Sequence, residues 1–518
     1  MELEENIALI NELERKFPVE QWMIDNVHVW PLIRIPLSFS VNAQESDANR
    51  FSPKSEGKVR KYVTKLASYG RGALYQFWSS VNDAKHNASA EDADVLIISS
   101  VQDRLLKLPN GENYNIHCDH IADILRQEGK NVLALEIASQ NRYRLPRYSK
   151  TRFIQAQLDW IRLKAEVDIL TSRRPMPNIV LDGYQEFGGT LAERGIGYSL
   201  PSGKQLANYV YVIQKTAAYI ARILRNKKIR VAMVVDYEST IGMALNLACR
   251  QTEIPSVDIQ HGVAGTLHGS YGRWRKVPQT GYELLPAVFW CWSEDDAATI
   301  DDWNGDVRNF HQAIVGGNSW EELWLDENSD IAAYYDDILA KEFADKQYEK
   351  KILVTLQTGG LIPPVVVRAI NQSPPSWLWH IRFHPYMTQD ERNSIYQELS
   401  GISQQANIEF VQCNSLPLMA LLRNVDVMIT EWSATVIDAK IMKTPSVAVH
   451  RYAEEYFPKE IEQGWIRPAY SPEAIIAAIE AQCLAKEKFR AENSNSHVSK
   501  ASAALKIIFP GMSARDQN

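Results

Sequence analysis

A histidine–proline pair follows an apolar run in the C-terminal half of the chain, in IRFHPYM (381–387). If the apolar residues form a strand, His384 lies at its end and can offer a ring nitrogen to a phosphate or a ribose. Pro385 fixes the turn that follows and can open a helix. Arg382 lies two residues earlier and therefore points to the same side of the strand. The pattern indicates a nucleotide-phosphate contact, and the alternative is a loop histidine followed by a turn proline.

A second polar group lies where an apolar run gives way to a helical pattern, in TEWSATVIDA (430–439). After Glu431, either Ser433 or Thr435 occupies the N-cap position of the expected helix. N–H groups and small hydroxyls at such a turn suit a phosphate. In QTGG (357–360), Gly359 and Gly360 end another strand, where a glycine turn commonly lies near a nucleotide. Ordinary helix capping is the alternative interpretation.

Candidates for a general base lie earlier in the chain. The segment DIQHGVAGTLHGSYG (258–272) leads from an apolar strand into His261 and a glycine-rich loop, where a histidine can deprotonate an acceptor. In VVDYEST (234–240), Asp236 and Glu238 end another strand just before a helix. The alternatives are a core histidine beside a glycine loop, and N-capping by either carboxylate. These patterns leave the identity of the base open.

Several activities are disfavoured by what the sequence lacks. It contains no P-loop lysine pattern, GxSxG elbow, HExxH or kinase motif set, and no DxD-like pair after a strand. We therefore expect metal-independent chemistry without a cofactor or metal ligand, in which histidine, hydroxyls and helix N-termini stabilise the leaving phosphate. The five cysteines form no CxxC pattern, which is typical of reduced thiols. A net charge of −7 disfavours nucleic acid as a partner.

The elements that must position these residues alternate in type along the chain. Buried strands are predicted at 93–100, 131–139, 229–237, 254–262 and 286–294, and helices at 119–129, 151–170, 203–226 and 239–254. From residue 351 the same alternation starts again. The predicted fold is α/β, with two Rossmann-type doubly wound domains facing a cleft. The predicted parts are an N-terminal helical segment (1–90), an acceptor domain (91–325), a connector (326–350), a donor domain (351–490) and a tail (491–518) that packs back on the first domain.

The N-terminus bears on location. MELEENIALINELERKF is acidic and amphipathic, unlike a signal peptide, and no apolar window is long enough to span a membrane. We therefore expect a cytoplasmic protein. The aromatic-rich segment 17–37 is expected to pack on a domain surface or to bind a partner. The basic, aromatic segment 58–81 predicts peripheral contact with the inner membrane, and a solvated helix face is the alternative.

The order of these motifs resembles a family. QHG with a glycine loop, then VGG (315–317), RFHP and a strand leading into ExSxxxxD are similar to bacterial GT-B transferases of surface polysaccharide synthesis. These include CMP-sugar (sialic acid or Kdo) transferases and CDP-glycerol glycerophosphotransferases, and the resemblance covers about residues 230–450. It implies that His384 and Pro385 contact the nucleotide phosphate together with Ser433 and Thr435. It also implies a base at His261 or, by similarity to the sialyltransferases, at a carboxylate such as Asp182 or Asp236.

The resemblance implies an inverting GT-B glycosyltransferase. The donor would be a nucleotide-sugar, with a CMP-linked one favoured, and the acceptor a saccharide or lipid-linked chain of lipopolysaccharide O-antigen or capsule. Two alternatives remain open. One is a CDP-polyol phosphotransferase of the teichoic-acid type, and the other is a non-catalytic GT-B-like subunit of a polysaccharide assembly complex. In one departure from the glycerophosphotransferases, HG continues here as HGVAGTLHG instead of with threonine, proline and lysine.

Overall fold

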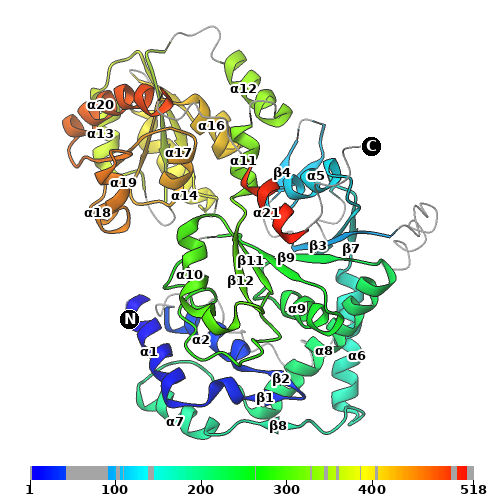
Figure 1. Cartoon of the computed structure of the whole chain (residues 1–518). Helices are drawn as coiled ribbons and strands as arrows, with labels where there is room; N and C mark the ends of the chain where they lie inside the picture. Colours follow the sequence, from blue (N-terminus) through cyan, green and yellow to red (C-terminus); the bar gives the residue numbers. More distant parts are fainter. Residues whose placement is uncertain are drawn as a thin grey trace. The chain divides into compact units, whose positions relative to one another are not determined.

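The protein consists of two compact units. Contacts group Met1–Ser319 with Ser499–Asn518 as unit 1, and Trp320–Val498 as unit 2. Figure 1 shows the chain as a computed structural model. The structure describes residues 3–42, 92–100, 105–108, 110–137, 145–262, 264–326, 329–342, 348–357, 361–385, 387–402, 406–491 and 499–509.

Unit 1 is built on a seven-stranded sheet in which every neighbouring pair is parallel. Its spatial order is β7 (Thr151–Phe153), β6 (Val132–Ile137), β3 (Val95–Ser100), β9 (Val231–Val235), β10 (Ser256–Ile259), β11 (Val288–Cys291) and β12 (Gln312–Val315). Numbered along the chain, these strands read 3-2-1-4-5-6-7, which contains the doubly wound Rossmann order. Every residue of β9 and β10 is buried, as expected for strands covered on both faces.

Helices cover this sheet. They are α5 (Asp119–Gln127), α6 (Gln155–Leu170), α8 (Gly203–Asn226), α9 (Thr240–Thr252), α10 (Glu294–Asn304) and α21 (Lys500–Ile508). Helix α7 (Tyr184–Glu193) instead packs its Phe187 against Trp22 and Trp30. Helix α8, which has the bounds predicted from its periodicity, packs against α9 and α6. Unit 1 also has two small antiparallel sheets. One has the order β2 (Val27–His28), β1 (Met23–Ile24) and β8 (Ile179–Val180), and the other pairs β4 (Leu105–Lys107) with β5 (Asn113–Asn115).

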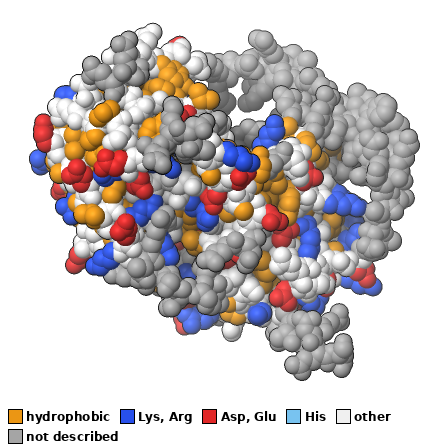
Figure 2. Space-filling view, turned by 90° about the horizontal axis from the view of Figure 1, so that it is seen from above, with side chains coloured by type: hydrophobic (Ala, Val, Ile, Leu, Met, Phe, Trp, Pro, Cys, Tyr) orange, Lys and Arg blue, Asp and Glu red, His pale blue; other side chains and the backbone are white. Residues whose placement is uncertain are grey.

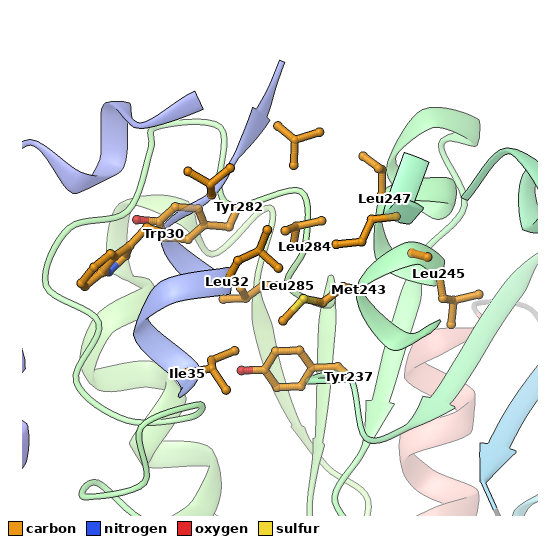
Figure 3. Close-up of a cluster of buried hydrophobic side chains, with 14 of the residues drawn as sticks. Trp30, Leu32, Ile35, Tyr237, Met243, Leu245, Leu247, Tyr282, Leu284 and Leu285 are labelled. Atoms are coloured by element: carbon orange, nitrogen blue, oxygen red, sulfur yellow. The ribbon is translucent and has the colours of Figure 1, made fainter. Parts of the chain in front are cut away.

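The N-terminal segment belongs to the core of unit 1. Helices α1 (Leu3–Lys16) and α2 (Trp30–Asn42) place Trp22 and Trp30 at 0% exposure. Figure 3 shows Leu32 of α2 beside Leu285 and Met243, and Ile35 of the same helix facing Tyr237. Segment 17–37 thus packs on the domain as expected. Trp22 and Trp30 are therefore core residues and are not themselves accessible to a partner.

Unit 2 repeats the same topology. Its six-stranded parallel sheet has the spatial order β15 (Asn407–Glu409), β14 (Trp377–Arg382), β13 (Lys350–Thr355), β16 (Val427–Thr430), β17 (Ser446–Ala448) and β18 (Ile466–Pro468). Along the chain this reads 3-2-1-4-5-6. The helices are α11 (Ser319–Leu325), α12 (Asp330–Glu342), α13 (Pro364–Gln372), α14 (Gln389–Ser400), α15 (Gln412–Ser415), α16 (Leu418–Asn424), α17 (Thr435–Ile441), α18 (Tyr452–Tyr456), α19 (Pro458–Glu462) and α20 (Pro472–Ala491).

The predicted fold class of two Rossmann-type units is therefore confirmed. Helix α12, which the sequence assigned to a connector, belongs to unit 2 by its contacts. Helix α21 packs on α5 and β12, which confirms that the described part of the tail returns to the first unit. The basic segment 58–81 lies outside the described residues. Within the described ranges, no helix is long and apolar enough to cross a membrane.

Candidate functional site

In both large sheets, the strand order reverses beside the first strand of the sheet. In unit 1, β3 lies between β6 and β9, and in unit 2, β13 lies between β14 and β16. The loops after the two flanking strands diverge at such a switch point and leave a crevice at the carboxyl ends, where α/β proteins bind ligands. The predicted residues Asp236, His261, His384 and Ser433 all lie in loops that follow strands of these sheets.

Three hydroxyl side chains meet at the switch point of unit 2. Thr355 ends β13, and Thr435 begins α17, with their Oγ1 atoms 3.4 Å apart. The N-cap of α17 is Ala434, so the prediction of an N-cap at Ser433 or Thr435 was wrong by one residue. The hydroxyl of Ser433 still accepts a hydrogen bond from the N–H of Thr435 at 3.3 Å. The predicted polar turn is therefore present, with different capping.

A glutamine side chain engages the N–H groups of this turn. With its amide oriented to satisfy both, Gln357 accepts hydrogen bonds from the N–H groups of Trp432 and Ser433, each at 3.1 Å. Two backbone donors thus converge on one acceptor oxygen, which is the arrangement that a phosphate oxygen also requires. The predicted residues Gly359 and Gly360 follow directly and lie outside the described residues.

His384 comes two residues after the end of β14. It is partly buried, and this burial lowers the pKa of its imidazole, so the ring is neutral at pH 7. Pro385 is exposed in the turn that follows. The next helix, α14, is opened by a capping box between Thr388 and Glu391, and not by Pro385 as predicted.

Arg382 has a structural role in this state. Its Nη1 donates to the carbonyl oxygen of Leu416 at 2.8 Å and to that of Cys413. Burial lowers the pKa of this guanidinium. The side chain thus holds the segment after β15 against the end of β14.

Glu431 directly follows β16 and is partly buried. Burial raises the pKa of its carboxyl, an effect that the charge of His450 opposes. Beside it, the rings of Trp432, His450 and Tyr452 contact one another, with centroids 4.4 to 5.4 Å apart. Deeper in α17, burial raises the pKa of Asp438 to about 6.

One group of potential metal ligands occurs among the described residues, away from this turn. It comprises His380, Glu409 and Cys413, whose ligand atoms lie within 4.8 Å of one another. The Nδ1 of His380 lies 3.1 Å from Glu409 Oε2, which also accepts from the N–H of Cys413 at 3.0 Å. The thiol of Cys413 donates to the carbonyl of Ile381 at 3.0 Å. These hydrogen bonds account for the cluster as a tie between β14, β15 and α15.

The switch point of unit 1 holds a cavity of about 990 Å³. It lies over the carboxyl ends of β3, β6 and β9 and between helices α6, α8 and α9. The polar side chains that line it are hydroxyls, amides and charged groups, namely Ser99, Ser100, Gln155, Asp159, Arg162, Glu166, Gln205, Asn208, Tyr209, Thr216, Asp236, Ser239 and Thr240. The remaining lining is aliphatic. Such a surface suits a ligand with many hydroxyl groups and some apolar area.

Asp236 lines this cavity directly after β9. Its φ of +73° is a left-handed conformation that a residue with a Cβ adopts only when its surroundings enforce it. The enforcement comes from the close approach of α9, because a Cβ at Gly242 would lie 2.5 Å from the carbonyl oxygen of Asp236. Ser239 caps α9 by accepting from the N–H of Gly242 at 3.1 Å. Neither Asp236 nor Glu238 therefore serves as the N-cap, which removes one alternative interpretation.

Two further carboxyls lie next to Asp236. Asp258, on β10, accepts from the N–H of Tyr237 at 3.0 Å and from the hydroxyl of Tyr271 at 2.9 Å. Complete burial raises the pKa of Asp258 to about 8. Burial, with a smaller contribution from the charge of Asp236, raises the pKa of Glu238 to about 7. This end of the sheet therefore concentrates carboxyls that titrate near neutrality.

His261 follows β10 and is partly exposed, and it does not line the cavity. In the same loop, burial and the charge of His261 lower the pKa of His268 to about 4. The neutral ring of His268 accepts from the N–H of Ser270 at 3.3 Å. The other candidate carboxylate, Asp182, is exposed at the start of α7, where its carbonyl accepts from Trp22 Nε1 at 2.7 Å.

The N-terminal helices hold this histidine loop. Glu14 and Arg34 form a fully buried ion pair of 2.9 Å. Arg34 also donates to the carbonyl oxygens of Gly269 and Gly272, the latter at 2.9 Å. A Cβ at Gly272 would lie 2.3 Å from the carbonyl oxygen of Thr266, so the loop needs glycine there. The first helices of the chain are therefore part of what shapes the site.

Sequence reasoning missed most of the cavity wall. The hydroxyls at the end of β3 and the polar side chains of α6 and α8 belong to no motif, and only tertiary packing brings them together. Asp258 was also missed, because a single carboxyl within an apolar strand gives no indication of its tyrosine partner. Glu238 was recognised as a strand-end carboxylate, but its raised pKa depends on burial that the sequence does not show.

Comparison with known proteins gives fold neighbours only. No family model matches the chain, and no curated protein does. Among solved structures, a UDP-GlcNAc 2-epimerase from Neisseria meningitidis bound to UDP-GlcNAc is similar at 13% identity and a TM-score of 0.48, covering 80% of this chain and 98% of that one. The 2-epimerase from Methanocaldococcus jannaschii has 11% identity, a TM-score of 0.47 and the same two coverages.

A ugt transferase from Siraitia grosvenorii in complex with UDP is also similar. It has 11% identity and a TM-score of 0.44, and covers 80% of this chain and 99% of that one. All three TM-scores lie below 0.5, so the function has to be argued from the residues of this chain.

Proposed function

We propose that the protein is a glycosyltransferase that moves a sugar from a nucleotide-sugar to a saccharide acceptor. The observation that carries this proposal is the presence of two switch points of the same kind, each furnished with polar side chains. One is rich in hydroxyls and backbone donors, and the other in carboxyls beside a large cavity. A transferase needs both, because it must stabilise a leaving phosphate and deprotonate an attacking hydroxyl.

The donor nucleotide is assigned to unit 2. Thr355, Ser433 and Thr435 offer hydroxyls, and the N–H groups of Trp432 and Ser433 already converge on one acceptor oxygen. A phosphate oxygen would replace the amide oxygen of Gln357 there. His384 would add a neutral ring nitrogen as a hydrogen-bond donor. Arg382, Pro385, Glu431, Gly359 and Gly360 complete the set proposed from the sequence, and a CMP-linked donor is favoured by the resemblance to CMP-sugar transferases.

The acceptor is assigned to the cavity of unit 1. Its hydroxyls, amides and aliphatic wall suit a sugar chain, and the resemblance points to surface polysaccharide or O-antigen as the source. Asp236 lies within this cavity and is the preferred base, with His261 as the alternative. The base takes the proton of an acceptor hydroxyl, whose oxygen bonds to the anomeric carbon as the bond to the nucleotide phosphate breaks. Attack from the side opposite the leaving group inverts that carbon.

The second candidate is a polyol-phosphate transferase. It is favoured by one observation, the QHG sequence that places His261 after β10, which is similar to the histidine of the glycerophosphotransferases. In that case the same unit 2 groups would bind a CDP-polyol, the acceptor oxygen would bond to the phosphorus that carries the polyol, and the diphosphate bond would break to release CMP. Label transfer from a CMP-sugar or from CDP-glycerol to a saccharide acceptor distinguishes the two activities.

A thermal-shift screen of CMP, CDP, UDP, GDP and dTDP tests the donor assignment. A ligand at 100 times its Kd stabilises a protein by about 2.7 kcal/mol, so a real donor nucleotide gives a clear shift. His384→Ala should lose this shift, while Ser394→Ala, which removes an exposed hydroxyl of α14 in the same unit, should keep it. If no nucleotide shifts the wild-type protein, the non-catalytic interpretation replaces the proposal.

A further inference from the structure

Helix α6 exposes an apolar face. Trp160, Leu163, Val167 and Leu170 are spaced three, four and three residues apart and therefore lie on one side of the helix. Trp160 is 52% exposed, Val167 41% and Leu170 70%. A soluble protein normally turns such a stripe toward its core, so its exposure requires an explanation.

The neighbouring side of α6 carries charged groups. Asp159, Arg162 and Glu166 line the cavity of unit 1, and Arg162 lies 3.3 Å from Glu166. Ala165 is the only residue of α6 that is buried. The helix therefore has one apolar side toward the protein, with Leu158 and Ile169 lining the cavity, and a second apolar stripe that is exposed, whose last residue, Leu170, also borders the cavity.

The apolar surface continues beyond the helix. Met176 is 94% exposed, and Ile179 and Val180 on β8 are 41% and 40% exposed. Strand β8 pairs with β1 on one side and forms the edge of its small sheet. We call the exposed residues of this stretch, Trp160–Val180, the α6 surface.

The α6 surface has cations and no exposed carboxylate. Apart from Arg162, which lies on the cavity side, its exposed charged residues are Lys164 and Arg173. The two carboxylates of the stretch are only partly exposed, and Asp168 accepts from the hydroxyl of Tyr211 at 3.1 Å while Glu166 pairs with Arg162. The whole chain, by contrast, has a net charge of −7. On the face seen in Figure 2, acidic and basic side chains are interspersed.

We propose that the α6 surface docks on an anionic lipid bilayer. Tryptophan, leucine and methionine can enter the boundary between head groups and acyl chains, while lysine and arginine bind the lipid phosphates. Lys164 already has this amphipathic arrangement, with Nζ 6.0 Å from the centre of the Trp160 ring. A second copy of the chain fits less well, because a two-fold contact would bring the cations of one patch against those of the other.

Vesicle co-sedimentation of the full chain tests the proposal. The wild-type protein should pellet with vesicles of equal parts phosphatidylcholine and phosphatidylglycerol, much less with phosphatidylcholine alone, and less in high salt. The double variant Leu170→Glu/Met176→Glu should bind roughly tenfold or more weakly, because the charges oppose insertion. Leu484→Glu, which alters a 75% exposed leucine of α20 in unit 2, should bind like wild type. Circular dichroism and thermal unfolding without vesicles check that each variant is folded.

Three outcomes would overturn the proposal. The wild-type protein could stay in the supernatant with the anionic vesicles, or Leu484→Glu could weaken binding as much as the double variant does. In the third, the double variant converts a dimer to a monomer in light scattering and leaves vesicle binding unchanged, which would assign the surface to a second copy. None of these measurements depends on nucleotide binding by unit 2, so their results are independent of the proposed transferase activity.

Discussion

The two units share a strand order and differ in what lies at its switch point. In unit 2, hydroxyls and backbone N–H groups gather at the ends of β13 and β16. In unit 1, the ends of β3 and β9 border a cavity of about 990 Å³ that Asp236 helps to line. In the proposed function, the shared topology places both sites at switch points, and the side chains after each strand distinguish a phosphate site from a proton-transfer site.

The largest expected effect separates these roles. Asp236→Asn keeps the size of the side chain and removes its basicity, so glycosyl transfer should fall by a factor of roughly 10²–10⁴, as for the loss of a general base. Nucleotide binding should persist, because unit 2 is unchanged. Transfer of labelled sugar measures the rate. Asp182→Asn is the matched control, and a comparable loss in that variant alone would move the base to Asp182.

The cores of the two units also differ, since only unit 1 incorporates N-terminal helices. Trp30 is completely buried and donates to Glu14 at 2.9 Å. Trp30→Ala should lower the free energy of unfolding by about 3–5 kcal/mol, through lost burial and the cavity left behind. Trp160→Ala removes the same side chain from a 52% exposed position and should change it little. Denaturant unfolding measures both. Equal effects would mean that the N-terminal segment is not part of the core.

A smaller effect should appear in the pH dependence. The folded state keeps protons on Asp258 and Glu238 up to pKa values of about 8 and 7, while the unfolded chain loses them near pH 4. The folded state therefore binds more protons in this window, and stability falls as pH rises through it. In unit 2, the pKa of Asp438 is raised only to about 6. Its contribution to stability is therefore already lost at a lower pH than those of Asp258 and Glu238.

The lowered pKa of His268, about 4, acts in the opposite direction, but only below the ordinary histidine value of 6.5. Calorimetry between pH 6.5 and about 8 thus isolates the carboxyls of unit 1. Asp258→Asn should flatten the decline in melting temperature over this range. A slope identical to that of wild type would show that Asp258 is not the titrating group.

The sequence was sufficient for the fold because its strands are buried on both faces and therefore appear as short aliphatic runs, as in ADVLIISS. Local patterns were less reliable where tertiary contacts decide. The expected helix at 151–170 begins with β7, whose three residues pair with β6. The aromatic residues of 17–37 were expected to pack on a domain, but the sequence did not show that Trp22 and Trp30 enter the core of unit 1.

The site divides in the same way. The residues around Ser433 and His384 could be named from the sequence because a strand followed by a helix defines their position. The cavity of unit 1 could not be named, because its wall is drawn from α6, α8 and α9, which are distant in sequence. The exposure of the apolar side of α6 was equally hidden, since periodicity identifies an apolar face but not the direction in which it points.

The central claim is that unit 2 binds the donor nucleotide while unit 1 supplies the base. Isothermal titration tests it most directly, using the full chain and the nucleotide that gives the largest thermal shift. Ser433→Ala should weaken nucleotide binding by about tenfold or more, because a hydrogen bond to a charged group is worth about 1.5–3 kcal/mol. Asp236→Asn should leave the Kd within about twofold, since it removes no group from unit 2. The reverse result, with binding lost in Asp236→Asn and retained in Ser433→Ala, would contradict the assignment of the donor to unit 2.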